Sequence, residues 1–484
     1  MSVLNELLDQ PFDPAPNVKV MFNVGALLDI PTGTFIEGRN GEYILNGGLS
    51  PLTGVVGIGN NFKSTFMHHM FLTALARSIN SSTGSTYDTE VNIQEWHLSG
   101  MISRQQEFNG EDVIASGRWV ITDKTQYSGN EWYAKQKAFL EAKLKNAGKI
   151  TVDTPFWNRD RKGPFKMLLP TFTEIDSFTE FETDDVIEMQ DKNELGESGG
   201  NTIHMRQGLA KMRLLMEAAR MNVGSYNYLL MTAHIGKETT MQNAGPGGSV
   251  PIVKLKHLKN GDRIKGTTDK FTFITHNCWH CYNANPLINQ GTKGPEYPRD
   301  STDDANLDTD LNIVNIRNLR SKSGASGMSQ LLIVSQTEGV LPSLTEFHYI
   351  KEIGRFGLSG SVQSYSLDLL PDVKLSRTTV RNKIDNDPKL RRALNITAEL
   401  CQMHELWHHL PEGFLCTPKE LYDDLKAKGY DLDMLLNTTR GWWTLDENHP
   451  LKFLSTYDLL NIRADKYKIY WLEDDKKTIK KEYR

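Results

Sequence analysis

Short apolar runs alternate with stretches of helical periodicity through roughly the first two thirds of the chain. Runs of strand length that alternate with amphipathic helices are typical of a parallel sheet buried between helices. The pattern therefore predicts an α/β fold with a mainly parallel, twisted sheet, and its last two runs predict a hairpin. The expected strands are residues 42–45, 54–57, 85–91, 167–178, 226–234, 270–282, 311–319 and 330–336. One expected helix begins at residue 63, and two others cover residues 134–147 and 205–220.

The character of the chain changes near residue 360. Beyond that point residues 374–409 and 417–428 have helical patterns, and short tryptophan-containing segments follow. A chain of 484 residues is long enough for two or three domains. The predicted domains are a lead-in (1–45), a core (46–360) and a helical or winged-helix-like C-terminal domain (361–484).

Composition excludes several classes of protein. Charged residues make up 24% of the chain and the formal net charge is −5, so any DNA contact must come from local basic patches. The four cysteines are too few for a disulfide scaffold, which favours a reducing compartment. The first residues lack the features of a signal peptide, and no apolar run approaches the ~18–20 residues that span a bilayer. We expect a cytoplasmic protein with no membrane partner.

The segment Thr53–Thr65, with the sequence TGVVGIGNNFKST, has the layout of a phosphate-binding loop. An apolar strand ends at Gly57, a turn rich in glycine and asparagine follows, and Lys63-Ser64 opens an amphipathic helix. In this layout the helix N-terminus faces the phosphates, Lys63 contacts the β- and γ-phosphates, and the Ser64 hydroxyl binds Mg²⁺. The alternative is a glycine turn before an ordinary buried helix. The predicted nucleotide-binding residues are Gly57, Gly59, Asn60, Asn61, Phe62, Lys63, Ser64 and Thr65.

Two carboxylates at strand ends complete the expected hydrolytic site. Asp176 ends an apolar run, as expected of a carboxylate that supports Mg²⁺, and Glu90 ends the strand after the phosphate-loop helix, where it can polarise the attacking water. Hydrolysis of ATP needs phosphate neutralisation, metal ligands and an oriented water, so the predicted cofactors are ATP and Mg²⁺. A helix-capping Asp and a polar strand end are the alternatives for these two residues.

These motifs resemble those of the RecA family, and in particular phage recombinases of the UvsX type. Phe62 occupies the position of the last glycine in G-x-x-x-x-G-K-[ST], and UvsX-type phosphate loops likewise carry Phe before Lys-Ser. Residues 47–64, 87–90 and 174–177 resemble, in the same order, the family's phosphate loop, its acidic strand end and its Walker B strand. The resemblance covers residues 45–340 and implies a RecA-like ATPase core.

The resemblance also implies roles that the residue patterns alone do not give. It makes Glu90 the catalytic base. It places His234, at the end of the expected strand 226–234, where relatives carry a γ-phosphate sensor that is Gln in many of them. Residues 196–199 and the helix after them resemble the family's first DNA-binding loop, beside which Arg206 is a candidate DNA contact.

Residues 320–327, RSKSGASG, resemble a different branch, the DnaB-type replicative helicases. In those proteins a basic pair before a Gly-x-x-Gly turn reaches into the ATP site of the neighbouring subunit, so Arg320 and Lys322 are candidate catalytic residues that act in trans. A cation supplied across an interface stabilises transition-state charge and couples hydrolysis to assembly. The alternative is a solvated basic hairpin turn.

A basic segment, residues 254–265, falls where RecA relatives carry their second DNA-binding loop. Its five cations in twelve residues suit a segment that follows the phosphates of a DNA strand. The alternative is a solvated polar face. The predicted DNA contacts are Arg206, Lys254, Lys256, Lys259, Arg263 and Lys265.

Two clusters of cysteine and histidine invite a metal-site interpretation. Residues 404–408 have the spacing H-E-x-x-H, but Pro411 ends the helix soon afterwards and a third ligand is not evident, which disfavours a metalloprotease. Residues 278–281 lie within an expected strand and lack a second pair, which disfavours metal or redox use. A structural zinc site remains an alternative to ordinary helix packing, with the ligands Cys401, His404, His408 and Cys416.

The leading hypothesis is an ATP-dependent recombinase that assembles on single-stranded DNA and promotes pairing and strand exchange. The alternatives are a hexameric replicative helicase, favoured by residues 320–327, and a RecA-like regulatory or packaging ATPase. The expected partners are single-stranded DNA, further copies of the chain in a filament or hexameric ring, and recombination or replication accessory proteins. The resemblance implies a phage protein that acts in the cytoplasm of an infected bacterium. Residues 361–484 are expected to bind DNA or a partner protein.

Overall fold

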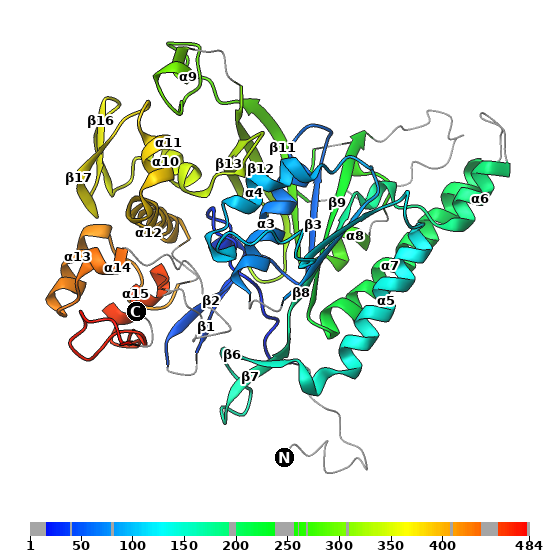
Figure 1. Ribbon diagram of the computed structural model, residues 1–484, viewed down its shortest axis with the longest axis horizontal. Helices are drawn as coiled ribbons and strands as arrows, with labels where there is room; N and C mark the ends of the chain where they lie inside the picture. Colours follow the sequence, from blue (N-terminus) through cyan, green and yellow to red (C-terminus); the bar gives the residue numbers. More distant parts are fainter. Residues whose placement is uncertain are drawn as a thin grey trace, which may run out of the picture.

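A large twisted sheet occupies the middle of the molecule, between the C-terminal helices on one side and two long helices on the other (Figure 1). The computed structural model describes residues 16–38, 41–78, 82–192, 200–237, 256–259, 261–267, 270–305, 309–406, 410–436 and 454–481. Among these residues, every helix is too short or too polar to cross a membrane.

The central sheet has the strand order β14-β13-β12-β11-β3-β9-β8-β4-β5, and β10 pairs with β9. The strands from β11 to β5 in this order run parallel, whereas β10, β12, β13 and β14 are antiparallel to their neighbours. This arrangement confirms the predicted α/β fold with a mainly parallel sheet, and the β12–β13 ladder confirms the predicted hairpin. The strands are β3 (Leu52–Gly57), β4 (Gly84–Asp88), β5 (Trp119–Asp123), β8 (Thr171–Asp176), β9 (Asn227–Lys237), β10 (Asp262–Ile264), β11 (Asn277–Pro286), β12 (Leu311–Ser321), β13 (Ser329–Ser335) and β14 (Gly339–Val340).

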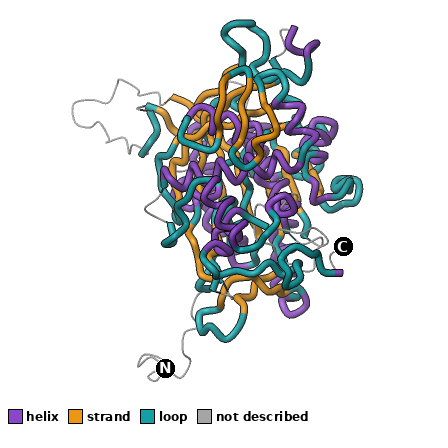
Figure 2. The backbone as a smooth tube through the Cα atoms, turned by 90° about the vertical axis from the view of Figure 1, so that its left-hand side faces the viewer, coloured by secondary structure: helices purple, strands orange, loops and turns teal. Residues whose placement is uncertain are grey.

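Helices cover both faces of this sheet (Figure 2). Strand β3 is buried along its whole length, and two consecutive residues of β3, Val55 and Val56, belong to two different hydrophobic clusters. The cluster around Val55 contains α3 and α4, and the cluster around Val56 contains residues of α5, α7 and α8. A strand buried on both faces is expected at the centre of a parallel sheet. The helices of this part are α3 (Lys63–Arg77), α4 (Glu95–Ser103), α5 (Gly129–Lys145), α6 (Asp184–Lys192), α7 (Gly200–Gly224), α8 (Lys270–Ile274) and α9 (Ser301–Ala305).

Proline divides one segment that the sequence pattern presents as a single strand. The run 167–178 contains Pro170, which has no N–H group to donate to a ladder. Residues before Pro170 belong to β7 (Pro164–Leu168), which pairs with β6 (Thr151–Trp157) in a separate small sheet, and β8 begins after it. The segment 92–165, for which the sequence pattern predicts no strand, contains β5 and β6.

The expected strand 270–282 is wrong in its first half. Residues 270–274 are the short helix α8, whose buried Phe271 lies against β3 at Gly54, where an added Cβ would meet the phenyl ring at 2.7 Å. The strand β11 begins at Asn277 and continues to Pro286. The packing of the Phe271 ring onto Gly54 of β3 therefore favours a helix at residues 270–274, where the local sequence pattern predicts a strand.

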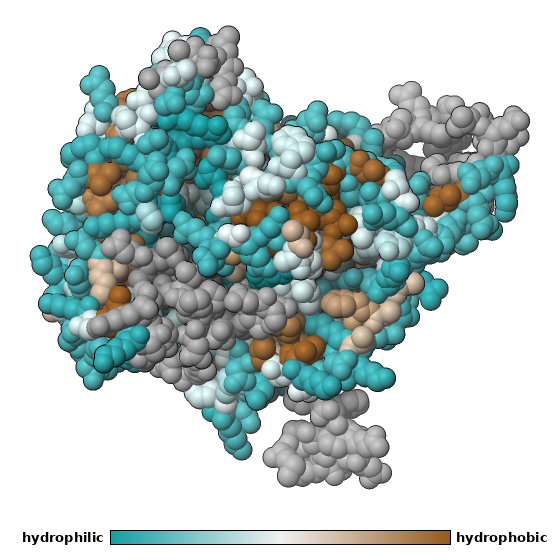
Figure 3. Space-filling model, in the orientation of Figure 1, coloured by the Kyte–Doolittle hydropathy of each residue, from teal (hydrophilic) through white to brown (hydrophobic). Residues whose placement is uncertain are grey.

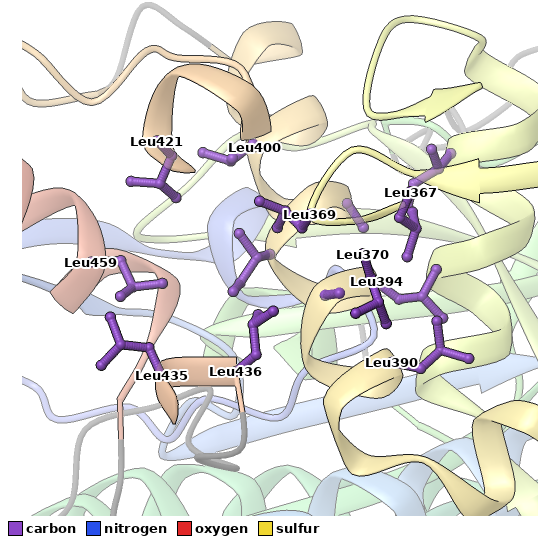
Figure 4. Close-up of a cluster of buried hydrophobic side chains, with 14 of the residues drawn as sticks. Leu367, Leu369, Leu370, Leu390, Leu394, Leu400, Leu421, Leu435, Leu436 and Leu459 are labelled. Carbon is purple, nitrogen blue, oxygen red and sulfur yellow. The ribbon is translucent and has the colours of Figure 1, made fainter. Parts of the chain in front are cut away.

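The C-terminal part of the chain shares its hydrophobic core with the edge of the central sheet and with the lead-in (Figure 4). Helix α12 packs on α10, and one cluster contains Leu45, Ile333, Phe347, Leu394 and Leu460. The helices at 380–405 and 418–427 agree with the helical patterns there, and the division into three domains remains a prediction. The elements of this part and of the lead-in are α2 (Asp29–Thr32), β1 (Thr34–Glu37), β2 (Tyr43–Asn46), α10 (Pro342–Ile353), β15 (Leu358–Ser361), β16 (Ser364–Leu367), β17 (Leu370–Leu375), α11 (Val380–Asn386), α12 (Pro388–Glu405), α13 (Pro418–Ala427), α14 (Leu432–Leu436) and α15 (Thr456–Arg463).

Candidate nucleotide-binding and catalytic site

The register of the parallel strands brings Asp176, His234 and the strand ends that precede Lys63 and Glu90 to one edge of the sheet. Gly57 of β3 lies beside His234 of β9, and Asp88 of β4 lies beside Asp176 of β8. Strand β8 also pairs with β9, where Ile175 lies beside Met231, so the ends of β3, β9, β8 and β4 lie side by side. Because polar residues at the carboxyl ends of parallel strands line the usual ligand-binding edge of an α/β sheet, this edge is the candidate site.

The predicted phosphate loop joins β3 to α3. Gly57 is required at the end of β3 because a Cβ there would approach the carbonyl oxygen of Cys281 in β11 to 2.6 Å. Asn61 donates from Nδ2 to the same oxygen at 3.0 Å and ties the loop to β11. No side chain caps the N-terminus of α3, so the N–H groups of its first turn are left for an anion.

Phe62, the residue that departs from the usual motif, adopts a left-handed conformation with φ 55° and ψ 30°. This conformation strains residues with a side chain and explains why glycine is usual at this position. The ring of Phe62 is half-buried against the cluster around Val55, so hydrophobic burial offsets the strain. Asn60, also left-handed, belongs to a residue type that tolerates this region. Ser64 and Thr65 follow in the first turn of α3.

Lys63 is buried at the start of α3 and points back over the loop. Its Nζ donates to the carbonyl oxygen of Ile58 at 2.9 Å. Burial lowers the pKa of Lys63, and the nearby charges of Asp176 and Glu90 oppose that shift. The charges of both predicted catalytic carboxylates therefore act on the lysine ammonium, which lies at the turn that is expected to hold phosphate.

Asp176 ends β8 and is 2% exposed. Its Oδ1 accepts a hydrogen bond from the hydroxyl of Thr232 in β9. Carboxylate and hydroxyl oxygens are the ligands that Mg²⁺ prefers, so Asp176 and Ser64 fit the metal site that ATP hydrolysis needs.

Glu90 and His234 form a pair across the site. Glu90 follows β4, His234 lies in β9, and Oε1 of the first is 3.0 Å from Nε2 of the second. The hydrogen bond with His234 lowers the pKa of Glu90 to about 2, against the opposing effect of burial. Glu90 is therefore ionised at neutral pH, as a group that orients and deprotonates water must be.

Two residues that the sequence pattern did not single out hold Glu90 in place. The carboxylate of Asp88 accepts four backbone hydrogen bonds, from the N–H groups of residues 90, 91, 92 and 93, at 2.8–2.9 Å. Thr89 donates its hydroxyl to the carbonyl of Ser177 at 2.8 Å and accepts the N–H of Ser177 at 2.7 Å. The loop of Glu90 is thus fixed to the end of β8, and a short polar run in the sequence gives no sign of this.

A second polar cluster lies beneath Asp176, on the same face of β8. Nδ1 of His68 in α3 is 3.0 Å from Oε2 of Glu174, which also accepts the Thr86 hydroxyl at 2.7 Å. Trp119 donates Nε1 to Thr86 at 2.8 Å. The cluster is fully enclosed and connects the phosphate-loop helix to β8, β4 and β5.

The candidate trans residues Arg320 and Lys322 lie away from the site of their own chain. Ser321 of β12 pairs with Asn277, which lies beside Thr53 at the start of β3. The phosphate loop follows the other end of β3, four residues or roughly 13 Å further along the strand. The guanidinium of Arg320 lies 5.4 Å from the ring centroid of Phe273 in α8.

The basic segment is tied to His234. Strand β10 pairs with the end of β9, and the N–H of Lys265 donates to the carbonyl of His234 at 2.7 Å. The predicted DNA contacts that the structure describes are all exposed. Lys254 and residues 196–199 lie outside the described residues. The exposed contacts are Arg206, Lys256, Lys259, Arg263 and Lys265.

The described residues among the candidate zinc ligands make other contacts. Nε2 of His404 lies 3.3 Å from the carbonyl oxygen of Cys416, and the thiol of Cys401 donates to the carbonyl of Phe356 at 3.6 Å. Burial raises the pKa of Cys401 to about 12. His408 lies outside the described residues, and among those that are described no three metal-ligating side chains come together.

Comparison with known proteins gives no evidence about function in addition to the geometry of the site. No family model and no curated protein matches the chain. Among solved structures the chain is similar to the crystal structure of the RadB recombinase, at 11% identity over 61% of this chain and 92% of RadB, with a TM-score of 0.30. A similarity this distant bears on no functional question, so the interpretation of the site rests on its geometry.

Proposed function

We propose that the chain is a RecA-like ATPase that assembles on single-stranded DNA and promotes strand pairing and exchange. The observation that carries the proposal is the convergence of Lys63, Asp176, Glu90 and His234 at the carboxyl ends of neighbouring strands. An open helix N-terminus, a buried lysine, a metal-type carboxylate and an ionised glutamate are the parts that phosphoryl transfer to water requires.

In the proposed reaction the β- and γ-phosphates of ATP lie on the N-terminus of α3. Lys63 neutralises their charge, and its burial strengthens this effect because the local dielectric is low. Glu90 orients the attacking water and accepts its proton. His234, hydrogen-bonded to Glu90, senses whether the γ-phosphate is present. Ser64 and Asp176 would hold Mg²⁺, which would supply further neutralisation of phosphate charge.

The path from nucleotide to DNA runs through β9 and β10. The backbone carbonyl of His234 accepts the N–H of Lys265, and Thr179 accepts the N–H of His234 at 2.9 Å and donates to the carbonyl of Lys265 at 3.1 Å. Lys265 is the last of the basic residues in the segment 256–265. A change in the position of His234 at the γ-phosphate is therefore transmitted to this segment through the hydrogen bonds that join His234 and Thr179 to Lys265.

The position of Arg320 and Lys322 favours self-association. They lie at the opposite edge of the sheet from Lys63, so in this proposal they complete the site of a neighbouring copy. The surface over β3 and α4 is partly apolar (Figure 3), and the residues beside the site include Ile58 and Val91, which are 53% and 44% exposed. Such an arrangement suits a filament or a six-membered ring, and the ring makes a hexameric helicase the second candidate function.

Two measurements test the proposal. ATP turnover, with and without single-stranded DNA, should fall at least roughly 10²-fold in Lys63→Ala and stay unchanged in Lys145→Ala, an exposed lysine of α5. Electron microscopy with an ATP analogue and single-stranded DNA should show open helical filaments. Closed six-membered rings that unwind a fork would favour the helicase, and turnover that ignores DNA of every kind would exclude both.

A further inference from the structure

A cavity of about 570 Å³ lies between the ATPase core and the C-terminal helices. Its walls come from the second half of α3, residues 103–107 after α4, residues 338–346, and the helices α11 and α12. Thr73, which lines it, is ten residues or about 15 Å along α3 from Lys63, so the cavity is separate from the nucleotide site. Its volume falls within the range of small-molecule sites in proteins.

Charged side chains of both signs line this cavity in equal number. The carboxylate of Glu338 binds two of the guanidiniums, Arg104 at 2.7 Å and Arg381 at 3.1 Å. Arg391 and Arg392, by contrast, make no ion pair within the described part of the chain. The guanidiniums are Arg77, Arg104, Arg381, Arg391 and Arg392, and the carboxyls are Glu107, Glu338, Glu346, Asp385 and Glu399.

Uncharged oxygen atoms hold these two guanidiniums in place. Arg391 donates to the carbonyls of Ile384 at 2.7 Å and Asp385 at 3.0 Å. Arg392, 5% exposed, donates to the carbonyl of Leu454 at 2.8 Å, to the hydroxyl of Thr456 at 3.4 Å and to the amide oxygen of Asn395. An uncharged acceptor fixes the orientation of a guanidinium without cancelling its charge, so both cations are pre-organised for an anion.

The carboxyls that are not paired with arginine do not neutralise this charge fully. Burial raises the pKa of Glu346 to about 8, and it also raises the pKa of Glu399 and of Glu107. Arginine stays charged at every pH that proteins meet. Near pH 7 Glu346 is therefore largely protonated, which leaves five guanidiniums with four other carboxyls in the lining. An apolar wall that includes Leu72, Met101 and Ile384 adjoins the charged one.

We propose that this cavity is a second ligand site, which binds a phosphate-bearing small molecule through Arg391 and Arg392. The apolar wall takes the remainder of the ligand. The site touches α3, which begins at Lys63, and the segment after α4, which follows the loop of Glu90, so its occupant acts on the ATPase as an effector. Binding itself does not depend on the function proposed above.

Calorimetric titration of the full chain with inorganic pyrophosphate tests this site, with Mg–ADP present at saturation to fill the phosphate loop. We expect one binding event in the wild type and in Arg220→Glu, an exposed arginine of α7, and an affinity at least about ten-fold lower in Arg391→Glu. Arg391→Gln, which changes the charge less, should give an intermediate loss, and unfolding curves of all variants check the fold.

Three outcomes would overturn the proposal: no heat beyond that of ADP, an unchanged affinity in Arg391→Glu, or a loss of pyrophosphate affinity in Lys63→Ala. The last outcome would place the pyrophosphate in the phosphate loop. A titration with ADP alone reports on the nucleotide site, so a failure of the cavity proposal and a failure of the proposed function give different results.

Discussion

The part of the chain that the structure describes contains two histidine–glutamate pairs of the same length in different surroundings. In each pair a ring nitrogen lies 3.0 Å from a carboxylate oxygen, His234 with Glu90 and His68 with Glu174. The side chains of the first pair are both 28% exposed, whereas those of the second are 4% and 0% exposed. The first pair lies at the open edge of the sheet, and the second lies beneath it against α3.

The difference shows that burial and the remaining partners decide what a charged pair does. Glu174 also accepts the hydroxyl of Thr86 and faces the interior on every side, so the buried pair joins α3 to the sheet. Glu90 keeps an accessible side and a lowered pKa, so the exposed pair is ready to accept a hydrogen bond from water. The exposed pair should therefore control turnover, and the buried pair should control stability.

The largest expected effect is on turnover at the exposed pair. Glu90→Gln keeps the shape of the side chain but removes its ability to accept a proton, so kcat for ATP should fall roughly 10²–10⁴-fold. Nucleotide affinity and the melting temperature should stay close to those of the wild type. The control is Glu95→Gln, an exposed glutamate at the start of α4, which should turn over normally. Normal turnover in Glu90→Gln would remove Glu90 from the mechanism.

The pH profile gives an independent test of the same residue. The pKa of Glu90 is about 2, below the ordinary value of 4.5, so Glu90 stays ionised as the pH falls from 8 to 5. Protonation of Glu90 should therefore contribute no loss of kcat in this range. An acid limb in kcat near pH 5 that disappears in Glu90→Gln would show that the hydrogen bond with His234 is absent in solution.

The next largest effect is on stability, at the buried pair. His68→Leu leaves the Glu174 carboxylate buried without its partner, and should lower the free energy of unfolding by about 3–5 kcal/mol in denaturant titrations. The double variant His68→Leu/Glu174→Leu removes both polar groups and should recover most of the loss. The control is His69→Leu, because His69 is equally buried but bonds a backbone carbonyl, that of Val24 at 3.2 Å. Equal losses in His68→Leu and His69→Leu would contradict the role of the carboxylate.

The same pair predicts how stability depends on pH. Burial disfavours the charged form of His68, but the carboxylate of Glu174 outweighs burial and raises the pKa above 6.5. A raised pKa in the folded state stabilises the protein fully below the unfolded value, and this contribution is lost as the pH rises through the folded value. Wild-type stability should thus decline above about pH 6.5, relative to the double variant.

The sequence predicts those parts of the site that are contiguous or end a strand. The candidate phosphate loop is one segment, so its glycines, Lys63 and the following helix carry enough pattern to predict it. Asp176 ends an apolar run and Glu90 ends a short predicted strand, and the parallel sheet brings such ends together. The hydrogen bond between His234 and Glu90 joins residues 144 positions apart, and its existence depends on the strand order, which the pattern does not give.

The parts that the sequence does not predict are those in which the residue type has many uses. Asp88 belongs to a short polar run that is ordinary at a strand end, and its four backbone contacts follow from the turn that the next residues make. The cavity beside α12 combines segments from residue 24 to residue 399, each of which resembles a normal amphipathic helix or loop. Phe271 packs on a glycine more than two hundred residues away, so the local pattern there predicts a strand instead of a helix.

The smallest expected effect concerns Asp88, which acts on the exposed pair through the backbone. Asp88→Asn keeps one oxygen acceptor in place of the carboxylate that now accepts four N–H groups, so the loop of Glu90 should loosen. We expect kcat to fall about ten-fold, equivalent to about 1.4 kcal/mol, with little change in KM for ATP. The control is Asp112→Asn, because Asp112 accepts two backbone N–H groups in an exposed turn outside the site.

A double-variant cycle separates positioning from a merely structural role. If Asp88 acts through Glu90, Asp88→Asn should have almost no effect on kcat in the Glu90→Gln background, because the group that it positions no longer accepts a proton. A ten-fold loss in both backgrounds would mean that Asp88 acts on the fold or on another group. Equal losses in Asp88→Asn and Asp112→Asn would likewise show that the effect is general to such turns and that the Glu90 loop needs no such support.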